Sequence, residues 1–225
     1  MRWLGRAAWA PSDPGWRVNA LFIVGSVLFA IGAFPPYSHF VDGRAVGITF
    51  VIGSLCFTAA GYGTAVKTFN EGRDNDLPTL RWTWSPRTTL WWAAVIQLLG
   101  TLLFNVSTID AMVTTFTVEE TNRLVWAPDV FGCIAFLVAS HLFWLNTNGP
   151  GWRRDIDDAD WWSVLLNYVG SLCFMASAIA AFTLRTTDEM LDVAIVNTAT
   201  FIGALCFLVG SYVLLPSAPE HGTPR

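Results

Sequence analysis

The sequence predicts an all-α integral membrane bundle of six transmembrane helices, arranged as three repeated two-helix hairpins. Three observations predict this fold class. The chain of 225 residues is 53% hydrophobic and only 13% charged, whereas soluble domains carry about 25% charged residues. The apolar residues stand in six long runs, and each run contains the same pattern of glycine, a small residue and phenylalanine. Lysine and arginine gather on one side of the predicted membrane.

Six stretches are long and apolar enough to cross a membrane, which takes about 20 mostly apolar residues. They cover residues 18–35, 46–66, 90–110, 126–146, 162–182 and 194–215, and none contains a lysine or arginine. The first stretch is the shortest. Because 17 residues precede it, which is long for the start of a signal peptide, we expect it to be a retained span.

The charges of the loops predict the orientation of the chain. Ten of the 13 lysines and arginines lie on the side that holds both termini, and three lie on the other side. Because short cytoplasmic loops are enriched in these residues, we expect a multi-pass protein of the plasma membrane with cytoplasmic N- and C-termini. Eleven of the 12 tryptophans lie near the same ends. We expect them to anchor the helices at the lipid head groups, or to receive a partner or a lipid there.

Each predicted span contains a glycine, a small residue, two further residues and then a phenylalanine. The pairs are Gly25/Phe29, Gly53/Phe57, Gly100/Phe104, Gly132/Phe136, Gly170/Phe174 and Gly203/Phe207. Small residues recur seven and eight positions after each glycine. At 100° per residue, all these positions share one face of the helix, which we call the Gly/Phe face. Small residues let helices approach closely in lipid, so we predict a packing motif with left-handed crossings of about +20°.

The six spans pair into three hairpins of about residues 1–70, 77–148 and 150–215, within a single polytopic membrane domain that covers residues 1–225. The first span of each hairpin carries a tryptophan nine residues before its glycine, at Trp16, Trp91 and Trp161. Charged linkers separate the hairpins. We expect the three hairpins to form a ring with the Gly/Phe faces inward.

The strings 22-FIVGSVLFAIGAF-34 and 50-FVIGSLCFTAAGY-62 resemble the YrhK-like domain, a short bacterial membrane domain built as a two-helix hairpin. The similarity is fainter in the third hairpin, and the middle hairpin departs most, because Gln97 and Asp129 replace the phenylalanine before the glycine. The resemblance implies a bacterial membrane hairpin in three copies. The family has no established activity, so the resemblance implies no functional residues.

Polar residues inside the spans are the candidate functional residues. The position three residues before the glycine lies on the Gly/Phe face, and it holds Gln97, Asp129 and Asn167 in the third to fifth spans. Successive spans run in opposite directions. Gln97 and Asn167 should therefore lie in the cytoplasmic half of the bundle, and Asp129 in the outer half.

Two of the candidates are ionisable, and an ionisable residue within a span is a functional hypothesis by default. Asp129 follows Pro128, and it suits either the first turn of a helix or a cation or proton site at an outer mouth. His141 is the only histidine within a span. We interpret it either as a hydrogen-bonded interior residue or as part of a proton relay with Asn167 or Gln97.

Several function classes are excluded. A net charge of −4 without a basic stripe argues against nucleic-acid binding. The four cysteines lie in apolar runs without a Cys-x-x-Cys pair, which is typical of small core residues and not of a zinc site. One histidine within the spans cannot form a bis-histidine haem site. We expect no cofactor, no metal and no catalytic residues.

Three hypotheses remain for the function. The first is a non-enzymatic bundle that binds lipid or partner proteins, including a second copy of the chain. The second is a small transporter or channel for a solute or protons, because internal repeats and polar groups near the membrane midplane are features of transporters. The third is a membrane enzyme that uses Asp129 and His141. Twelve residues of helix would separate these two side chains by about 18 Å, so we expect no enzymatic activity.

Overall fold

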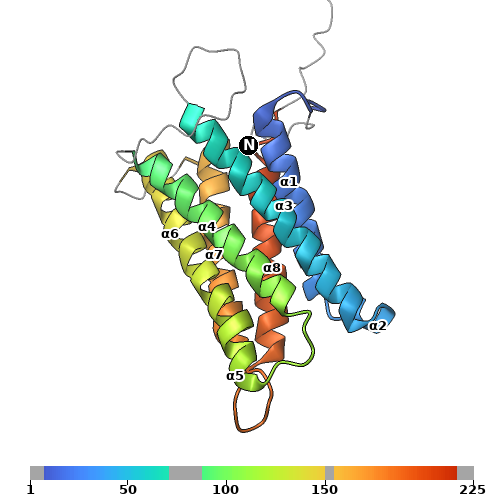
Figure 1. Ribbon diagram of the computed structural model, residues 1–225. Coiled ribbons are helices and arrows are strands. Elements are labelled where there is room, and N and C mark those ends of the chain that lie inside the picture. Colours follow the sequence, from blue (N-terminus) through green and yellow to red (C-terminus); the bar gives the residue numbers. More distant parts are fainter. Residues whose placement is uncertain (1–7, 71–87, 150–154, 217–225) are drawn as a thin grey trace, which may run out of the picture.

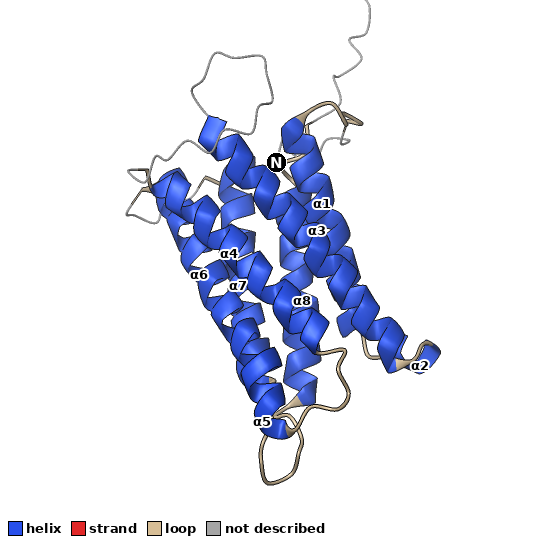
Figure 2. Cartoon of the chain, in the orientation of Figure 1, coloured by secondary structure: helices blue, strands red, loops and turns tan. Residues whose placement is uncertain are grey.

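Six long helices make up the bundle in the computed structural model, which describes residues 8–70, 88–149 and 155–216 (Figure 1). The helices are α1 (Pro14–Ala33), α2 (Tyr37–Phe40), α3 (Gly43–Asn70), α4 (Thr89–Asp110), α5 (Val118–Glu120), η1 (Thr121–Trp126), α6 (Ala127–Asn148), α7 (Ala159–Ala180) and α8 (Val193–Tyr212). Figure 2 shows described loops that join α1 to α3, α4 to α5 and α7 to α8. The predicted all-α fold with six long apolar helices is therefore confirmed.

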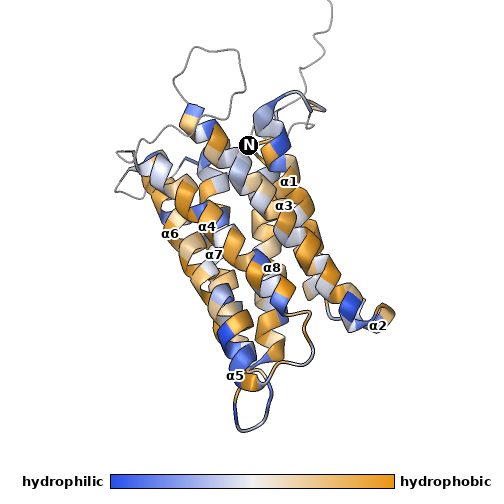
Figure 3. Cartoon of the chain, viewed as in Figure 1, coloured by the Kyte–Doolittle hydropathy of each residue, from blue (hydrophilic) through white to orange (hydrophobic). Residues whose placement is uncertain are grey.

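All six long helices are apolar enough to span a membrane, counting α5, η1 and α6 as one continuous helix from Val118 to Asn148. Apolar residues predominate along their lengths, and polar residues gather at their ends and in the loops (Figure 3). Large apolar side chains such as Ile52, Leu99 and Leu172 are exposed on the outside of the bundle. Water would disfavour so much exposed apolar surface, so the chain is a multi-pass membrane protein whose outer surface contacts lipid.

The six long helices form a closed ring that follows the order of the chain. Within the predicted hairpins, α1 packs on α3, α4 on α6 and α7 on α8. Between hairpins, α3 packs on α4 and α6 on α7, and α8 returns to pack on α1. This last contact joins the two ends of the chain, so every long helix has two neighbours and one face toward the bundle axis.

Two glycines face each other where the helices of each hairpin cross. A methyl group added to Gly25 would lie 3.0 Å from the carbonyl oxygen of Gly53 and 2.8 Å from Cδ2 of Phe57. The contact is reciprocal, because a methyl group on Gly53 would lie 2.7 Å from Cδ2 of Phe29. The pairs Gly100/Gly132 and Gly170/Gly203 repeat this arrangement, at 3.0 to 3.2 Å from the facing carbonyl oxygen. Each phenylalanine thus lies over the glycine of the neighbouring helix.

The phenylalanines that follow these glycines fill the middle of the bundle. All six are at most 8% exposed. Phe57, Phe136 and Phe207 form a triangle with ring centroids 5.8 to 6.3 Å apart. Phe174 lies 6.1 Å from Phe29 and 6.3 Å from Phe104. The twelve residues of the predicted packing motif therefore form one continuous buried core, which we call the phenylalanine core.

Hydroxyl groups join neighbouring hairpins beside this core. The hydroxyls of Ser54 and Thr108 lie 2.9 Å apart between α3 and α4, and those of Ser140 and Ser171 lie 2.9 Å apart between α6 and α7. Such interhelical hydrogen bonds contribute about 0.6 to 2 kcal/mol each in lipid. The small residues that let the helices approach thus also supply polar contacts between them.

The fourth span begins eight residues earlier than the sequence analysis placed it. Thr117 caps the helix, because its hydroxyl accepts from the Glu120 N–H and the Glu120 carboxylate accepts from the Thr117 N–H. Pro128 then lies in the helix interior, where its ring would clash with the carbonyl four residues back. The π-helical turn η1 directly precedes it, and the Ala127 N–H bonds to the Asn122 carbonyl five residues back. This wider turn accommodates the proline.

The predicted tryptophan anchors are only partly at the bundle surface. Trp9 is exposed and Trp92 is 45% exposed, but Trp91, Trp144 and Trp161 are buried. Trp91 packs against Phe69 and Ala65 of α3. Anchoring at the head groups is therefore wrong for the three buried residues, which pack between helices. Hydropathy predicts that a tryptophan lies near the end of a helix, but it does not predict whether a neighbouring helix buries the side chain.

Replacing Gly100 by alanine should destabilise the bundle, because the added methyl group meets backbone that cannot rotate away. Overpacking of this kind costs about 1 to 3 kcal/mol. We expect a lower thermal unfolding midpoint in detergent for Gly100→Ala. The matched control is Gly43→Ala, since a methyl group there has no neighbour within 4 Å among the described residues. Equal midpoints for the two variants would contradict the close glycine crossing.

Candidate functional site

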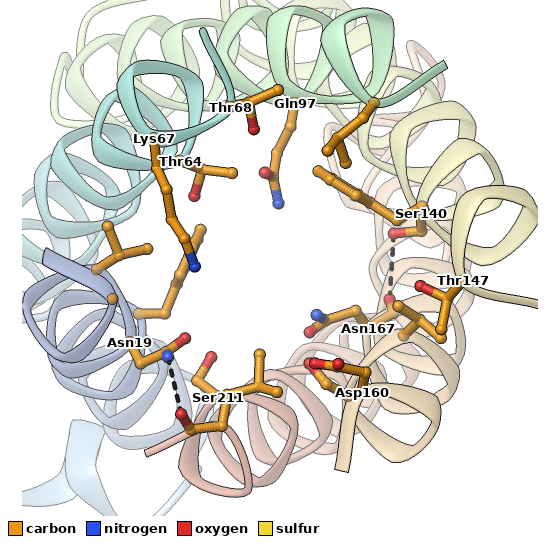
Figure 4. Close-up of a pocket in the computed structure, with 18 residues that line it drawn as sticks. Asn19, Thr64, Lys67, Thr68, Gln97, Ser140, Thr147, Asp160, Asn167 and Ser211 are labelled. Carbon is orange, nitrogen blue, oxygen red and sulfur yellow. Dashed lines mark hydrogen bonds between the residues drawn. The ribbon is translucent and has the colours of Figure 1, made fainter. Parts of the chain in front are cut away.

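A polar cavity of about 260 Å³ opens at the end of the bundle where α1, α4 and α7 begin and where α3, α6 and α8 end. All six long helices line it (Figure 4). Its polar side chains come from Asn19, Thr64, Lys67, Thr68, Gln97, Ser140, Thr147, Asp160, Ser163, Asn167 and Ser211. Pockets for drug-sized ligands measure about 300 to 1,000 Å³, so this cavity suits a smaller molecule or a head group.

The phenylalanine core closes the inner end of the polar cavity. Phe22 lines the cavity, and its ring lies edge-on to that of Phe57, with centroids 5.6 Å apart. Phe57 belongs to the triangle that fills the bundle axis. The cavity is therefore a dead end in this structure and not a pore.

The opposite end of the bundle is held together by side chains that bond to backbone. The Trp126 indole N–H donates to the Ala178 carbonyl at 2.9 Å. The Asn122 amide pairs with both backbone groups of Thr183, at 2.8 and 3.0 Å. These bonds fix the loop after α7 against η1. The two ends of the bundle thus differ, since polar side chains converge on a cavity at one and bind backbone at the other.

Two amide side chains point into the polar cavity from different helices. Gln97 extends from α4 and Asn167 from α7 (Figure 4), and Gln97 is only 7% exposed. Within the described residues, no protein group donates a hydrogen bond to Oε1 of Gln97 or Oδ1 of Asn167. A methyl group on Gly210 would lie 3.1 Å from this Asn167 oxygen, so Gly210 leaves room for the amide. Buried acceptors without a partner cost about 1 to 3 kcal/mol each, and a bound donor would remove that cost.

A third amide lies on the α1 side of the same cavity. Asn19 donates from Nδ2 to the Leu214 carbonyl at 3.4 Å, and this bond joins α1 to the turn that follows α8. Its oxygen stays on the cavity side (Figure 4). Three amides from α1, α4 and α7 therefore surround the same space.

Two charged side chains of opposite sign stand among the described residues that line the cavity. Lys67 lies in the last turn of α3 and Asp160 in the first turn of α7. Both are exposed at the rim. A carboxylate is favoured in the first turn of a helix and an ammonium group in the last turn, so the helix ends themselves accommodate the two charges.

The structure brings together two of the four polar residues that the sequence analysis singled out. Gln97 and Asn167 line the cavity, whereas Asp129 and His141 do not. Asp129 is partly buried in the other half of the bundle, because α6 runs opposite to α4 and α7. It lies eleven residues inside the continuous helix that begins at Val118, so its interpretation as a residue that caps the start of the span is wrong.

His141 lies on the outer surface of α6. It is exposed, and its ring centroid is 6.1 Å from that of Tyr168. Its neighbour Ser140 faces the cavity and bonds to Ser171. One residue corresponds to a turn of 100° around a helix, which carries His141 out of the interior. The interior location is therefore wrong, and His141 does not line the cavity with Asn167 and Gln97, as the alternative of a proton relay requires.

The sequence predicts Asn19 only as a residue that hydrogen-bonds between helices, and it does not single out Lys67 or Asp160. A usable signal was nevertheless present, because Lys67 lies 14 residues after Gly53 and Asp160 lies ten residues before Gly170. At 100° per residue these offsets fall about 40° and 80° from the glycines, on the Gly/Phe face. Both residues lie just outside the apolar runs, so hydropathy alone does not predict that they line the bundle interior.

Comparison of the chain with known protein families, with curated proteins and with solved structures finds no match. The similarity to the YrhK-like domain therefore stays a prediction from the sequence. In the described ranges 8–70, 88–149 and 155–216, no group of three or more histidine, cysteine, aspartate or glutamate side chains could hold a metal ion.

A cysteine at Thr64 should react with a water-soluble maleimide, because the thiolate that reacts forms only where water enters. Thr64 lines the cavity, whereas Tyr62 lies two residues away on the lipid-facing side of α3. We expect Thr64→Cys to label well above the wild-type background in nanodiscs and Tyr62→Cys to label far less. Equal labelling of the two positions would contradict a water-accessible cavity.

Proposed function

We propose that the protein is a non-enzymatic membrane protein that binds a small polar molecule or a lipid head group in the polar cavity. The observation that carries this proposal is the convergence of Gln97 and Asn167 on one space, with a buried acceptor oxygen on each that no described protein group satisfies. A ligand that donates to both oxygens gains two hydrogen bonds and removes the cost of two unpaired acceptors. The depth of the amides and the small volume favour one compact group.

The arrangement of the ionisable residues supports a binding role rather than catalysis. General acid–base catalysis needs a titratable group within hydrogen-bond reach of the reacting atom. Asp129 and His141 lie away from the cavity lining, and the two charges at its rim are exposed. The groups that reach the deep part of the cavity are amides, hydroxyls and Phe22, which bind well but do not titrate near neutral pH.

Transport of a small solute is a second candidate, favoured by the position of the cavity within the ring of six helices (Figure 4). A solute that enters this cavity stands directly above the phenylalanine core. To cross, it would have to displace the triangle of Phe57, Phe136 and Phe207, whose centroids lie at most 6.3 Å apart. Binding requires no such movement, and for that reason we place it first.

The charge distribution of the loops supports a location in the plasma membrane with cytoplasmic termini. In that orientation the cavity opens to the cytoplasm, because the first turn of α1 and the last turn of α8 lie at its rim. The similarity to a bacterial domain supports a bacterial origin. Binding of a partner protein or of a second copy of the chain remains part of the proposal, and the exposed apolar faces of the helices are compatible with either.

Replacing Gln97 and Asn167 by leucine should abolish retention of a bound molecule, because leucine keeps the volume and removes the donors and acceptors. Each lost hydrogen bond weakens binding by about 1.4 kcal/mol, or about tenfold. Native mass spectrometry of the protein in nanodiscs measures the retained species directly. His141→Ala is the matched control, since His141 lies beside Ser140 but on the outer surface. A species that the Gln97→Leu/Asn167→Leu double variant retains as well as the wild type would overturn the proposal.

A flux assay in liposomes separates the two candidate functions. Binding without transport predicts that the wild-type protein leaves a panel of entrapped amino acids, sugars and protons in place. Transport predicts a flux that Gln97→Leu reduces and His141→Ala leaves unchanged. Observation of such a flux would replace the first candidate by the second.

A further inference from the structure

We infer that the polar cavity takes a small zwitterion, with its anionic group toward Lys67 on α3 and its ammonium group toward Asp160 on α7. This inference rests on the proposed binding function and names the chemical class of the ligand. Its basis is the distribution of charge and of hydrogen-bonding groups over the walls of the cavity.

The wall formed by α3 is electropositive. Lys67 directs its ammonium group into the cavity (Figure 4), and its Nζ lies 3.7 Å from the position that a methyl group on Gly15 would occupy. The ammonium group of Lys67 therefore lies next to the start of α1. Lys67 is accompanied by the hydroxyl of Thr68. An ammonium group beside a hydroxyl is suited to a carboxylate or a phosphate.

The wall formed by α7 is electronegative. Asp160 and Asn167 lie seven residues apart, which is about two turns on the same helix face. The carboxylate of Asp160 stands at the rim and the free Oδ1 of Asn167 lies deeper. Because two turns of helix span about 10 Å, the ammonium group of a small ligand bonds to one of these two acceptors, and the charged carboxylate of Asp160 forms the stronger hydrogen bond. The buried Oε1 of Gln97 on α4 adds a third acceptor on the way across the cavity.

The two charges face each other without forming an ion pair. Among the described residues, neither Lys67 nor Asp160 is part of a salt bridge, although each is close enough for its charge to act on the other. Together they make the charge of the cavity lining zero. A ligand with a single charge would satisfy one wall and be repelled by the other. A zwitterion oriented from α3 to α7 complements both, and such complementarity provides specificity.

A free amino acid and the head group of phosphatidylethanolamine share this chemistry. Each has a primary ammonium group and an anionic group a few bonds away. The cavity opens at the end of the bundle where α1, α4 and α7 begin. Dissolved amino acids and lipid head groups are both present at the membrane surface. The experiment therefore includes an arm for each source.

The test measures binding to the full-length protein in phosphatidylglycerol nanodiscs, a lipid that lacks an ammonium group. The probes are glycine, β-alanine, 4-aminobutyrate and 6-aminohexanoate, which differ only in the spacing of their charges. Acetate, methylammonium and glycerol serve as comparison probes. We expect one amino acid of this series to bind at least tenfold more tightly than any comparison probe. In nanodiscs of mixed lipids, we expect native mass spectrometry to show phosphatidylethanolamine retained over phosphatidylglycerol if the lipid is the source.

Charge reversal identifies the residues that select the ligand. Lys67→Glu or Asp160→Lys alone should weaken binding of the best probe about two- to fivefold, the range expected of exposed ion pairs. The double variant Lys67→Glu/Asp160→Lys should restore binding to within about twofold, because the zwitterion can bind in the reverse direction. Arg44→Glu, an exposed charge at the opposite end of α3, is the matched control and should have no effect.

Two outcomes overturn the inference. Binding of acetate, methylammonium or glycerol as tight as that of every amino acid would exclude a zwitterion. A double variant no better than the single variants would exclude recognition by the two charges. In either case, Gln97→Leu is then measured with the probe that does bind. Weaker binding to this variant would keep the proposed binding function, and unchanged binding would contradict it. Thermal unfolding midpoints of all variants show whether a loss of binding reflects a loss of folding.

Discussion

The reciprocal contact between glycine and phenylalanine in each hairpin is the constraint on which the rest of the bundle depends. Helices in lipid gain little from the hydrophobic effect, and they associate through close packing and interhelical hydrogen bonds. The glycine pairs bring two backbones so close that a methyl group would lie 3.0 to 3.3 Å from the facing carbonyl oxygen. Each phenylalanine then fills the space beside the glycine opposite. Because three hairpins direct these phenylalanines toward one axis, the ring closes around them.

The position of the polar cavity is a consequence of this core. The phenylalanines occupy the middle of the axis, so the space between the helices can stay open only toward the ends. At one end, Trp126 and Asn122 bond to the backbone around Ala178 and Thr183. At the other end, the side-chain oxygens of Gln97 and Asn167 have no hydrogen-bond partner among the described residues, and polar side chains line a cavity whose inner end is closed by Phe22 and Phe57. One pattern of residues therefore produces both the rigid core and the site.

The features that follow from the periodicity of residues along a single helix could be predicted from the sequence. Six apolar runs and a Gly/Phe face are such features, and so is the position of Gln97 and Asn167 on the inner side. The start of the fourth span at Val118 was missed because Glu119 and Glu120 interrupt the apolar run, although Thr117 and Glu120 have the spacing of a capping box. The burial of Trp91 and Trp161 depends on neighbours far apart in the chain. Periodicity within one helix carries no information on such neighbours.

The most direct test of the closed ring is cross-linking between α1 and α8. The rings of Phe34, at the end of α1, and Phe201 of α8 lie 5.9 Å apart. Cysteines at these two positions should join efficiently through a short bifunctional thiol reagent in the membrane. Cysteines at Phe34 and Ile109 should not, because α1 and α4 are not neighbours in the ring and Ile109 is exposed on the outer surface. Failure of the first pair, or equal cross-linking of both pairs, would show that the six helices do not close around the phenylalanine core.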